Sequence, residues 1–325
     1  MTASTEGTEP GDEQHGADAS GALPHCYRHP GRETGVRCTR CDRPICPQCM
    51  VPASVGFQCP ECVTEGRKSV RPAKTMYGGA VNRGGLDVTR VLIGINVAVF
   101  VITTASGGGF VSGGGTSSVY DRFALIPPAV AHGEWWRLGS SMFLHYGILH
   151  IAFNMWALYV IGSPLEQWLG RLRYLMLYAL SGFGGSLLSF ATGPLHSASA
   201  GASGAIFGIF GAFFVISRRR GLETGAITGL IAINLVLSFT ISNIDWRGHV
   251  GGLIVGAAVA AALAWPPPGP RRNTLQAAGC AAIAVVLALA GFVGVRHVDS
   301  RCQALIRAPQ QSADFVFCAH YDPPG

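Results

Sequence analysis

Seven apolar segments alternate with polar connections over residues 88–295 of the chain. The segments lie at 88–105, 138–161, 174–193, 202–217, 222–242, 248–265 and 275–295. An α-helix of about 20 apolar residues crosses a bilayer core of about 30 Å, and most of these segments are long enough to do so. The pattern therefore predicts an all-α polytopic membrane protein with seven transmembrane helices.

Basic residues occupy alternate connections between these segments. They precede the first segment and recur at 171–173, 218–220 and 271–272. Cytoplasmic loops carry the excess of Lys and Arg in membrane proteins. We therefore expect a multi-pass protein of the cell membrane, with the N-terminus in the cytoplasm and the tail at 296–325 outside.

The composition excludes an ordinary soluble protein, because 49% of the residues are hydrophobic and only 13% are charged. The first 24 residues carry five acidic residues and no Lys or Arg, which predicts a disordered tail at 1–24. Residues 64–87 form a basic linker. A nucleic-acid site is one interpretation of this linker, but a basic segment directly before a hydrophobic span is more typical of the cytoplasmic side of a membrane. We therefore expect no nucleic-acid partner.

Residues 25–63 contain four closely spaced pairs of metal-ligand side chains. Two ligands separated by two residues can bind one tetrahedral ion, and eight ligands fill two closed sites, so we expect two structural Zn2+ ions. A disulfide-rich extracellular module is the alternative. It is disfavoured because no apolar segment follows Met1, which argues against a secretory signal peptide. The predicted ligands are Cys26, His29, Cys38, Cys41, Cys46, Cys49, Cys59 and Cys62.

A serine and a histidine stand at the heads of two apolar segments. Gly201-Ala202-Ser203-Gly204 begins the fourth segment, and Gly248-His249 begins the sixth. Small residues at helical spacing are common where membrane helices pack, so either motif alone is compatible with packing. An ionisable histidine within a span is costly in lipid and is usually functional. Because a serine hydroxyl becomes a nucleophile when a nearby base takes its proton, the two motifs together predict Ser203 as nucleophile and His249 as base.

His150 and Asn154 lie four residues apart in the second segment, so they share one helix face. They either cap or bridge helices, or they donate hydrogen bonds to negative charge that develops during a reaction, as an oxyanion hole does. His145 is compatible with both roles. The predicted topology brings these side chains together with Ser203 and His249 in the outer half of the membrane. The fourth segment rises only about 24 Å, so its head should lie below the outer surface, in a hollow that water reaches.

The chain resembles the rhomboid intramembrane serine proteases over residues 88–265. The resemblance rests on Trp136-Arg137, His145-x4-His150-x3-Asn154, Glu166 with Gly170, Gly201-x-Ser203-Gly204 and His249-x2-Gly252-x3-Gly256. It implies a six-helix core and a catalytic dyad of Ser203 and His249. His150, Asn154 and the Ser203 amide are the implied oxyanion donors. The implied reaction, which needs no metal or nucleotide, cleaves transmembrane or membrane-anchored proteins near the outer face of the bilayer. The seventh helix (266–295) and the cysteine module are additions to this core.

The cysteine module resembles the B-box zinc fingers, whose ligands interleave between two ions. The resemblance implies one site made of Cys26, His29, Cys46 and Cys49, and a second made of Cys38, Cys41, Cys59 and Cys62. A module of this type is also a candidate binding site for a protein partner.

Two other classes of function compete with proteolysis. An inactive rhomboid-like protein would bind membrane helices without cutting them, although the chain carries both dyad residues. A metal-ion carrier would use His132, His145, His150 and His249 as ligands, since imidazole binds many metals. The carrier interpretation leaves Ser203 without a role.

The outer tail contains two cysteines, Cys302 and Cys318. If the tail lies outside, it lies in an oxidising compartment, where disulfides form and persist. A disulfide between the two residues and a pair of free thiols in a disordered tail are both compatible with the sequence.

Overall fold

The computed structural model describes residues 23–69, 73–81, 84–107, 109–110, 117–241, 244–307 and 312–321. The chain divides into two compact units, residues 1–72 and 73–325, which are considered separately below. The tail predicted to be disordered lies outside the described residues, except for Leu23 and Pro24.

The first unit is built from two short antiparallel hairpins and one helix. Strand β1 pairs with β2, and β3 pairs with β4. Its buried side chains are almost all cysteines, joined by Ile45, which is fully buried. An apolar core this small cannot stabilise a domain of this size by itself, which favours a cross-linked or metal-bound unit. The elements are β1 (His25–Cys26), β2 (His29–Glu33), η1 (Pro47–Cys49), β3 (Val51–Pro52), β4 (Phe57–Gln58) and α1 (Pro60–Ser69).

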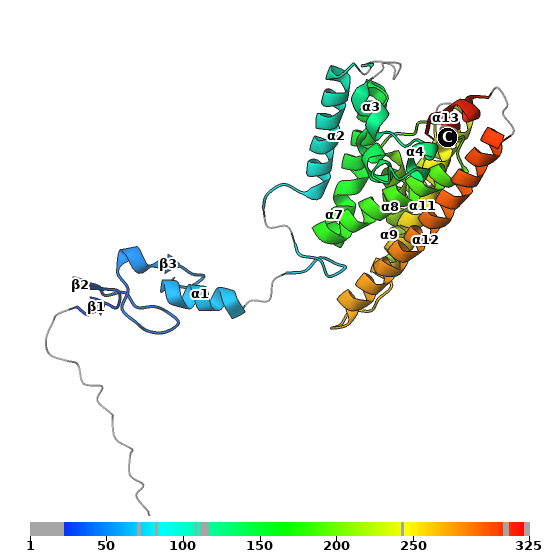
Figure 1. Ribbon diagram of the computed structural model, residues 1–325. Helices are drawn as coiled ribbons and strands as arrows, with labels where there is room; N and C mark the ends of the chain where they lie inside the picture. The colour runs from blue at the N-terminus through cyan, green and yellow to red at the C-terminus, as the bar shows by residue number, and fades with distance from the viewer. Residues whose placement is uncertain are drawn as a thin grey trace, which may run out of the picture. The chain divides into compact units, whose positions relative to one another are not determined.

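The second unit is entirely helical in its named elements, and each of the seven apolar segments forms a helix (Figure 1). Within the described residues, five helices are long and apolar enough to cross a membrane: α2, the continuous run from α6 to α7, α8, α11 and α12. The apolar helices α9 and α10 are shorter. The bounds are α2 (Val88–Ala105), α6 (Ile148–Ala157), η3 (Leu158–Gly162), α7 (Ser163–Leu169), α8 (Arg171–Thr192), α9 (Ser203–Arg219), α10 (Gly225–Thr240), α11 (Trp246–Ala264) and α12 (Arg272–Arg307).

Short helices occupy the connection between α2 and α6, and a last one follows α12. They are α3 (Ser118–Phe123), α4 (Pro127–Ala131), α5 (Arg137–Ser140), η2 (Ser141–Phe143) and α13 (Ala313–Tyr321). In Figure 1, α13 lies beside α4 at one end of the bundle, and both helices contact α12.

The second apolar segment differs from its predicted limits. The long helix begins at Ile148 rather than at residue 138, because an extended Gly147 separates it from α5 and η2. His145 therefore lies before the helix and not within it. At the other end the helix continues through the π-helical turn η3 into α7, so Glu166 lies on a helix and not in a loop.

The seventh helix is also longer than predicted, since α12 continues to Arg307 instead of ending at residue 295. The polar residues after position 295 share this part of the helix with Val298 and Cys302, which are fully buried in a cluster with Leu195 and Phe190. A packed apolar face thus extends the helix beyond the apolar stretch.

Part of the predicted basic linker packs on the helical unit. Tyr77 is 4% exposed and belongs to the main hydrophobic core. Its carbonyl accepts a hydrogen bond from Gln276 Nε2 at 3.1 Å, and its amide donates to the carbonyl of Trp168 at 3.3 Å. The earlier part of the linker is helical, because α1 extends to Ser69.

Helices α8, α9 and α11 form the centre of the second unit, between α2 and α12 in Figure 1. Glycines let their backbones touch. A β-carbon added at Gly252 of α11 would overlap the carbonyl oxygen of Gly204 on α9, and one added at Gly256 would overlap that of Gly208. This close approach determines the separation of the two helices that carry Ser203 and His249.

Candidate active site and metal centres

Ser203 is the first residue of α9, and His150 lies next to the backbone that leads into it. Gly201 has a φ of 141°, which favours glycine. A β-carbon at this position would lie 2.9 Å from His150 Cε1, 3.0 Å from its Nε2, and 3.5 Å from Ser203 Oγ. The structure therefore brings the predicted nucleophile and the His150 imidazole to the same turn of backbone.

His249 lies on α11 beside the same helix, α9. Its imidazole stacks on Phe207, with ring centroids 4.1 Å apart and planes inclined by 10°. Phe207 follows Ser203 by one helical turn, so the two share a face of α9. The His249 side chain is 9% exposed, and its Nδ1 lies 2.6 Å from Ser238 Oγ on α10. No direct hydrogen bond joins Ser203 to His249 among the described residues.

The hydrogen bonds of His150 indicate which of its ring nitrogens carries the proton. The backbone amide of Tyr146 donates to His150 Nδ1 at 3.4 Å. An amide can only donate, so Nδ1 accepts and the neutral ring carries its proton on Nε2. Nε2, the atom that carries this proton, would lie 3.0 Å from a β-carbon placed at Gly201. Tyr146 stacks on the same ring at 5.6 Å and donates its hydroxyl proton to the carbonyl of Ala198.

Asn154 follows His150 by one turn on α6. It is 8% exposed, and its Nδ2 has no hydrogen-bond partner in the described part of the chain. A buried amide donor without a hydrogen-bond partner destabilises the fold by about 1–3 kcal/mol. Such a donor calls for an explanation, and one explanation is that a substrate group accepts its hydrogen bond. His145, the other predicted polar residue here, is 3% exposed and packs edge-on against His150 at 5.0 Å.

Asp245 connects both halves of the site, a role that the sequence did not suggest. Its carboxylate accepts hydrogen bonds from Ser199 Oγ at 2.8 Å and from Ser189 Oγ, and it caps α11 through the amides of Arg247 and Gly248 at 3.2 and 3.4 Å. The backbone before Ser203 is thereby tied to the start of the helix that carries His249. An aspartate directly before a helix is a recognisable N-cap signal.

Two charged side chains stabilise the surroundings of the site. Arg137, 4% exposed, pairs with Glu134 at 2.5 Å and donates to the carbonyls of Asp121 and Ala124 at 2.7 and 2.8 Å. Glu166 accepts three hydrogen bonds at the start of α2, from the Val88 and Thr89 amides and the Thr89 hydroxyl, at 2.7–2.9 Å. Negative charge is favourable at a helix N-terminus, so Glu166 holds α2 on the bundle.

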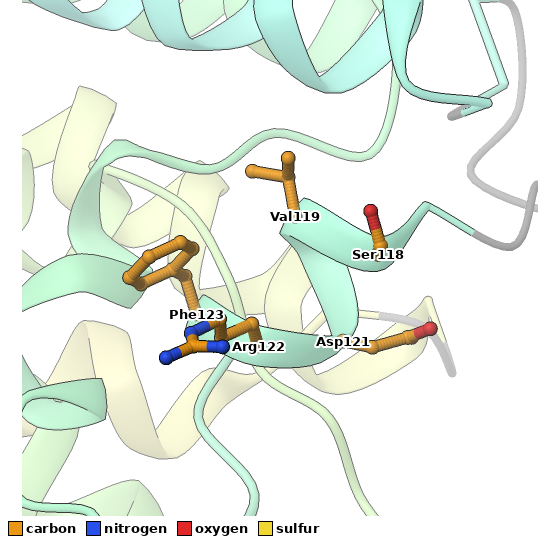
Figure 2. Close-up of a pocket in the computed structure, with 5 residues that line it drawn as sticks. All are labelled: Ser118, Val119, Asp121, Arg122 and Phe123. Carbon is orange, nitrogen blue, oxygen red and sulfur yellow. The ribbon is translucent and has the colours of Figure 1, made fainter.

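A shallow hollow on α3 includes Asp121, whose carbonyl accepts the hydrogen bond from Arg137. Figure 2 shows that its lining comes from one short segment, and none of the predicted catalytic residues is part of it. The lining residues are Ser118, Val119, Asp121, Arg122 and Phe123.

The first unit gathers the eight predicted metal ligands into two groups of four, with all ligand atoms of a group within 4.8 Å of one another. The groups have the interleaved composition implied by the B-box resemblance: Cys26, His29, Cys46 and Cys49, and Cys38, Cys41, Cys59 and Cys62.

The distances within the two groups suit a tetrahedral ion. His29 Nδ1 lies 3.4–3.8 Å from the sulfurs of its group, and Cys41 Sγ lies 3.7 Å from Cys59 Sγ. Zinc bonded to sulfur at about 2.3 Å and to nitrogen at about 2.0–2.1 Å would separate neighbouring ligand atoms by about 3.6–3.8 Å. The backbone amide of Cys59 donates to Cys38 Sγ at 3.2 Å, and that of Cys62 donates to Cys59 Sγ at 3.3 Å, so outer hydrogen bonds orient these two sulfurs.

Comparison with known families covers the segment that holds the candidate active site. Residues 132–266 match the rhomboid domain, and this range includes Ser203, His249, His150 and Asn154. Residues 132–266 are therefore similar to rhomboid domains. Together with the five candidate spans, this similarity indicates a multi-pass membrane protein.

Several curated proteins are similar to the rhomboid domain and its flanks. Rhomboid protease GluP of Bacillus subtilis (strain 168) is 38% identical over 219 residues, which are 65% of this chain and 42% of GluP. The putative rhomboid protease YdcA of the same organism is 40% identical over 132 residues, or 39% of this chain and 66% of YdcA. Rhomboid protease AarA of Providencia stuartii is 33% identical over 159 residues, or 40% of this chain and 56% of AarA. The chain therefore spans less than two thirds of each relative.

Proposed function

We propose that this protein is an intramembrane serine endopeptidase that cuts transmembrane or membrane-anchored proteins. The observation that carries the proposal is the arrangement around Ser203. The His150 N–H lies against the preceding turn, Asn154 Nδ2 is buried without a hydrogen-bond partner among the described residues, and His249 stacks on Phe207, one turn after Ser203. A nucleophile, a base and two donors are the groups that acyl transfer needs. The similarity to GluP, YdcA and AarA supports the same activity.

In the proposed reaction, Ser203 Oγ attacks the scissile carbonyl carbon while its proton passes to His249. The carbonyl oxygen becomes an oxyanion, for which the Ser203 amide, His150 Nε2–H and Asn154 Nδ2 are the available donors. The tetrahedral intermediate then expels the amine, which takes the proton from His249, and leaves an acyl-serine. Water, deprotonated by His249, hydrolyses the ester and returns Ser203 to its starting state.

The depth of the site is consistent with substrates that lie in the membrane. Helix α9 has 17 residues, so it rises only about 25 Å and cannot span the bilayer core with Ser203 at its surface. A substrate helix must also unwind before its backbone reaches Ser203, because helical carbonyls are occupied by hydrogen bonds. We infer from the basic connections that cleavage occurs near the outer face, with the N-terminus in the cytoplasm.

A catalytically inactive rhomboid-like protein that binds membrane helices is the second candidate. The lack of a hydrogen bond between Ser203 and His249 favours it. However, hydrogen bonds between catalytic groups are often long in the absence of substrate and shorten in the reactive complex.

A serine-directed fluorophosphonate distinguishes the two candidates without knowledge of the natural substrate. The wild-type protein should be labelled and should cut a single-span test substrate, whereas Ser203→Ala and His249→Ala should do neither. Ser197→Ala, in the loop before Ser203, and His297→Ala, exposed on α12, are matched controls that should behave as wild type. Wild-type protein that is folded yet neither reacts nor cuts would establish the inactive alternative.

We further propose that the two ligand groups of the first unit bind Zn2+ as a structural ion. Every tetrahedral position would be filled by protein, so no site for a reacting water remains on the metal. Metal analysis of the purified chain should give about two zinc ions, and about one in Cys38→Ser. Cys280→Ser, which alters a buried thiol outside both groups, should keep two. The proteolytic rate of Cys38→Ser on a minimal substrate should match the wild type, and a binding role of this unit toward a protein partner stays a prediction.

A further inference from the structure

Ser238 is a buried hydroxyl that contacts the candidate base, and the proposed reaction has not yet used it. It lies near the end of α10 and is 3% exposed. Its Oγ is 2.6 Å from His249 Nδ1 and also 2.6 Å from the carbonyl oxygen of Asn234, one turn earlier on its own helix. Both distances are within the range of good hydrogen bonds.

Proton counting assigns a direction to each of these two bonds. A serine hydroxyl has one proton and two lone pairs, and a backbone carbonyl can only accept. Ser238 therefore donates its proton to Asn234, and only a lone pair of Oγ remains for His249. The bond to His249 must then be donated by the imidazole, so Nδ1 carries a proton.

This assignment determines what the other ring nitrogen can do. A neutral imidazole holds a single proton, so Nε2 keeps its lone pair and can accept the proton of a serine nucleophile. When Nε2 is protonated, Nδ1–H still donates to the same oxygen, and no group has to rearrange between the two states. The stack on Phe207 restrains the plane of the ring, while Ser238 restrains its rotation within that plane.

We propose that Ser238 is a positioning residue that holds His249 in the Nδ1–H tautomer, completing the dyad with a neutral hydroxyl from a third helix. The proposal rests on the proteolytic function given above. It assigns to Ser238 the role that a carboxylate has in serine protease triads, where the third member orients the histidine and selects its tautomer. Here the bond to Asn234 takes up the only proton of the Ser238 hydroxyl, so Ser238 Oγ is left to accept a hydrogen bond from His249 Nδ1.

The two β-branched residues threonine and valine give a matched test, because they have nearly the same shape and differ by one hydroxyl. In Ser238→Thr the hydroxyl can repeat the bond to the carbonyl one turn earlier and accept from Nδ1. We expect this variant to keep most of the activity. In Ser238→Val the imidazole loses its acceptor, and we expect about a tenfold or larger fall in kcat with little change in KM. The rate of fluorophosphonate labelling should fall in parallel.

A purely structural role would not separate these two variants in the same way. Both are to be assayed as full-length protein in membranes and compared by thermal unfolding. Equal kcat in Ser238→Thr and Ser238→Val, at equal stability, would overturn the proposal. A fall in both that follows a shared loss of stability would overturn it as well.

Nitrogen NMR of histidine-labelled protein gives a readout that does not depend on turnover. The resonances lost in His249→Gln identify the residue among the ten histidines. Wild type and Ser238→Thr should show Nδ1 protonated, and Ser238→Val should show an increased share of the Nε2–H form. An Nε2–H tautomer in the wild type would refute the proposal. If the wild type neither cuts nor reacts with the phosphonate, the proteolytic function fails, and the NMR result still decides whether Ser238 selects the tautomer.

Discussion

The imidazole of His249 lies flat against the ring of Phe207, with centroids 4.1 Å apart. Phe207 is 3% exposed and occupies the position one turn after Ser203, on the helix that faces α11. An aromatic residue at this point therefore helps to determine where the proposed base lies relative to the proposed nucleophile. A phenyl ring has no hydrogen-bonding atoms, so the stack restrains the imidazole without competing for its nitrogen atoms.

Phe207→Leu should lower kcat by about three- to tenfold, because an aromatic pair contributes about 0.5–1.5 kcal/mol beyond its buried area. Phe207→Tyr retains the ring and should stay close to the wild-type rate. Cleavage of a single-span substrate, normalised to folded protein, measures the difference. Equal rates for the two variants would mean that the stack does not position His249.

Gly252→Ala should destabilise the helical unit, because its new β-carbon would overlap the Gly204 carbonyl where α9 and α11 touch. Overpacking in a close-packed interior costs about 1–3 kcal/mol. Gly229→Ala on α10 is the control, since among the described residues no atom beyond its own stretch of helix backbone lies within 4 Å of the added carbon. This control should be neutral or more stable by up to about 1 kcal/mol, as alanine favours helix. Thermal unfolding in the same detergent compares them, and equal midpoints would contradict the observed packing.

Asp314 on α13 binds the loop that precedes Ser203. Burial opposes ionisation of this carboxyl, but hydrogen bonds from the imidazole and amide of His196, at 2.6 and 2.9 Å, outweigh it and hold its pKa below the ordinary value. A depressed carboxyl pKa stabilises the fold above the ordinary value of about 4, and this stabilisation is lost as the pH falls through the folded-state pKa.

We therefore expect Asp314→Asn to be less stable than wild type at pH 7, by less than about 1 kcal/mol because both side chains are partly exposed. The difference should disappear at acidic pH. Melting curves at several pH values measure it, with Asp299→Asn on α12 as a control that has no bond to this loop. A difference that persists unchanged at low pH would exclude the carboxylate as its source.

Cys302 and Cys318 form a disulfide that joins α12 to α13. The two residues are separated by 16 positions, and closing a loop of this size stabilises a fold by about 3 kcal/mol in the chain-entropy treatment. A membrane-impermeant thiol reagent applied to intact cells should label the pair only after reduction. Labelling without reduction would argue against the bond in cells. If neither condition gives labelling, while the denatured protein labels normally, the predicted outer location of the tail is wrong.

The hydrophobic pattern predicted the helices well, because burial in lipid or protein imposes long apolar runs on the sequence. Its errors lie where local and tertiary effects compete. Met142 and Phe143 are apolar but belong to the short helix η2 before Gly147, and α12 continues past residue 295 on two buried residues, Val298 and Cys302. The average hydrophobicity of a segment does not show that one face of a helix is apolar and buried.

Parts of the candidate site could not be predicted from the sequence, because they depend on contacts between distant segments. Ser238 is one serine in an apolar helix, and only the approach of α11 reveals its bond to His249. The hydrogen bonds from Ser189 and Ser199 to the Asp245 carboxylate likewise join segments that are far apart in the sequence. The metal ligands were the opposite case, since their short spacing is a local property of the chain.

Cysteine serves opposite purposes at the two ends of this polypeptide, and this affects how the protein must be handled. Seven thiols in the first unit must stay reduced if they bind zinc as proposed, whereas Cys302 and Cys318 are oxidised to each other. A buffer with strong reductant protects the first group and opens the second. A chelator, often added to inhibit contaminating proteases, would remove the proposed zinc ions from the first unit. Purification should therefore omit the chelator. Any reducing step should be brief and mild, so that the disulfide between Cys302 and Cys318 survives it.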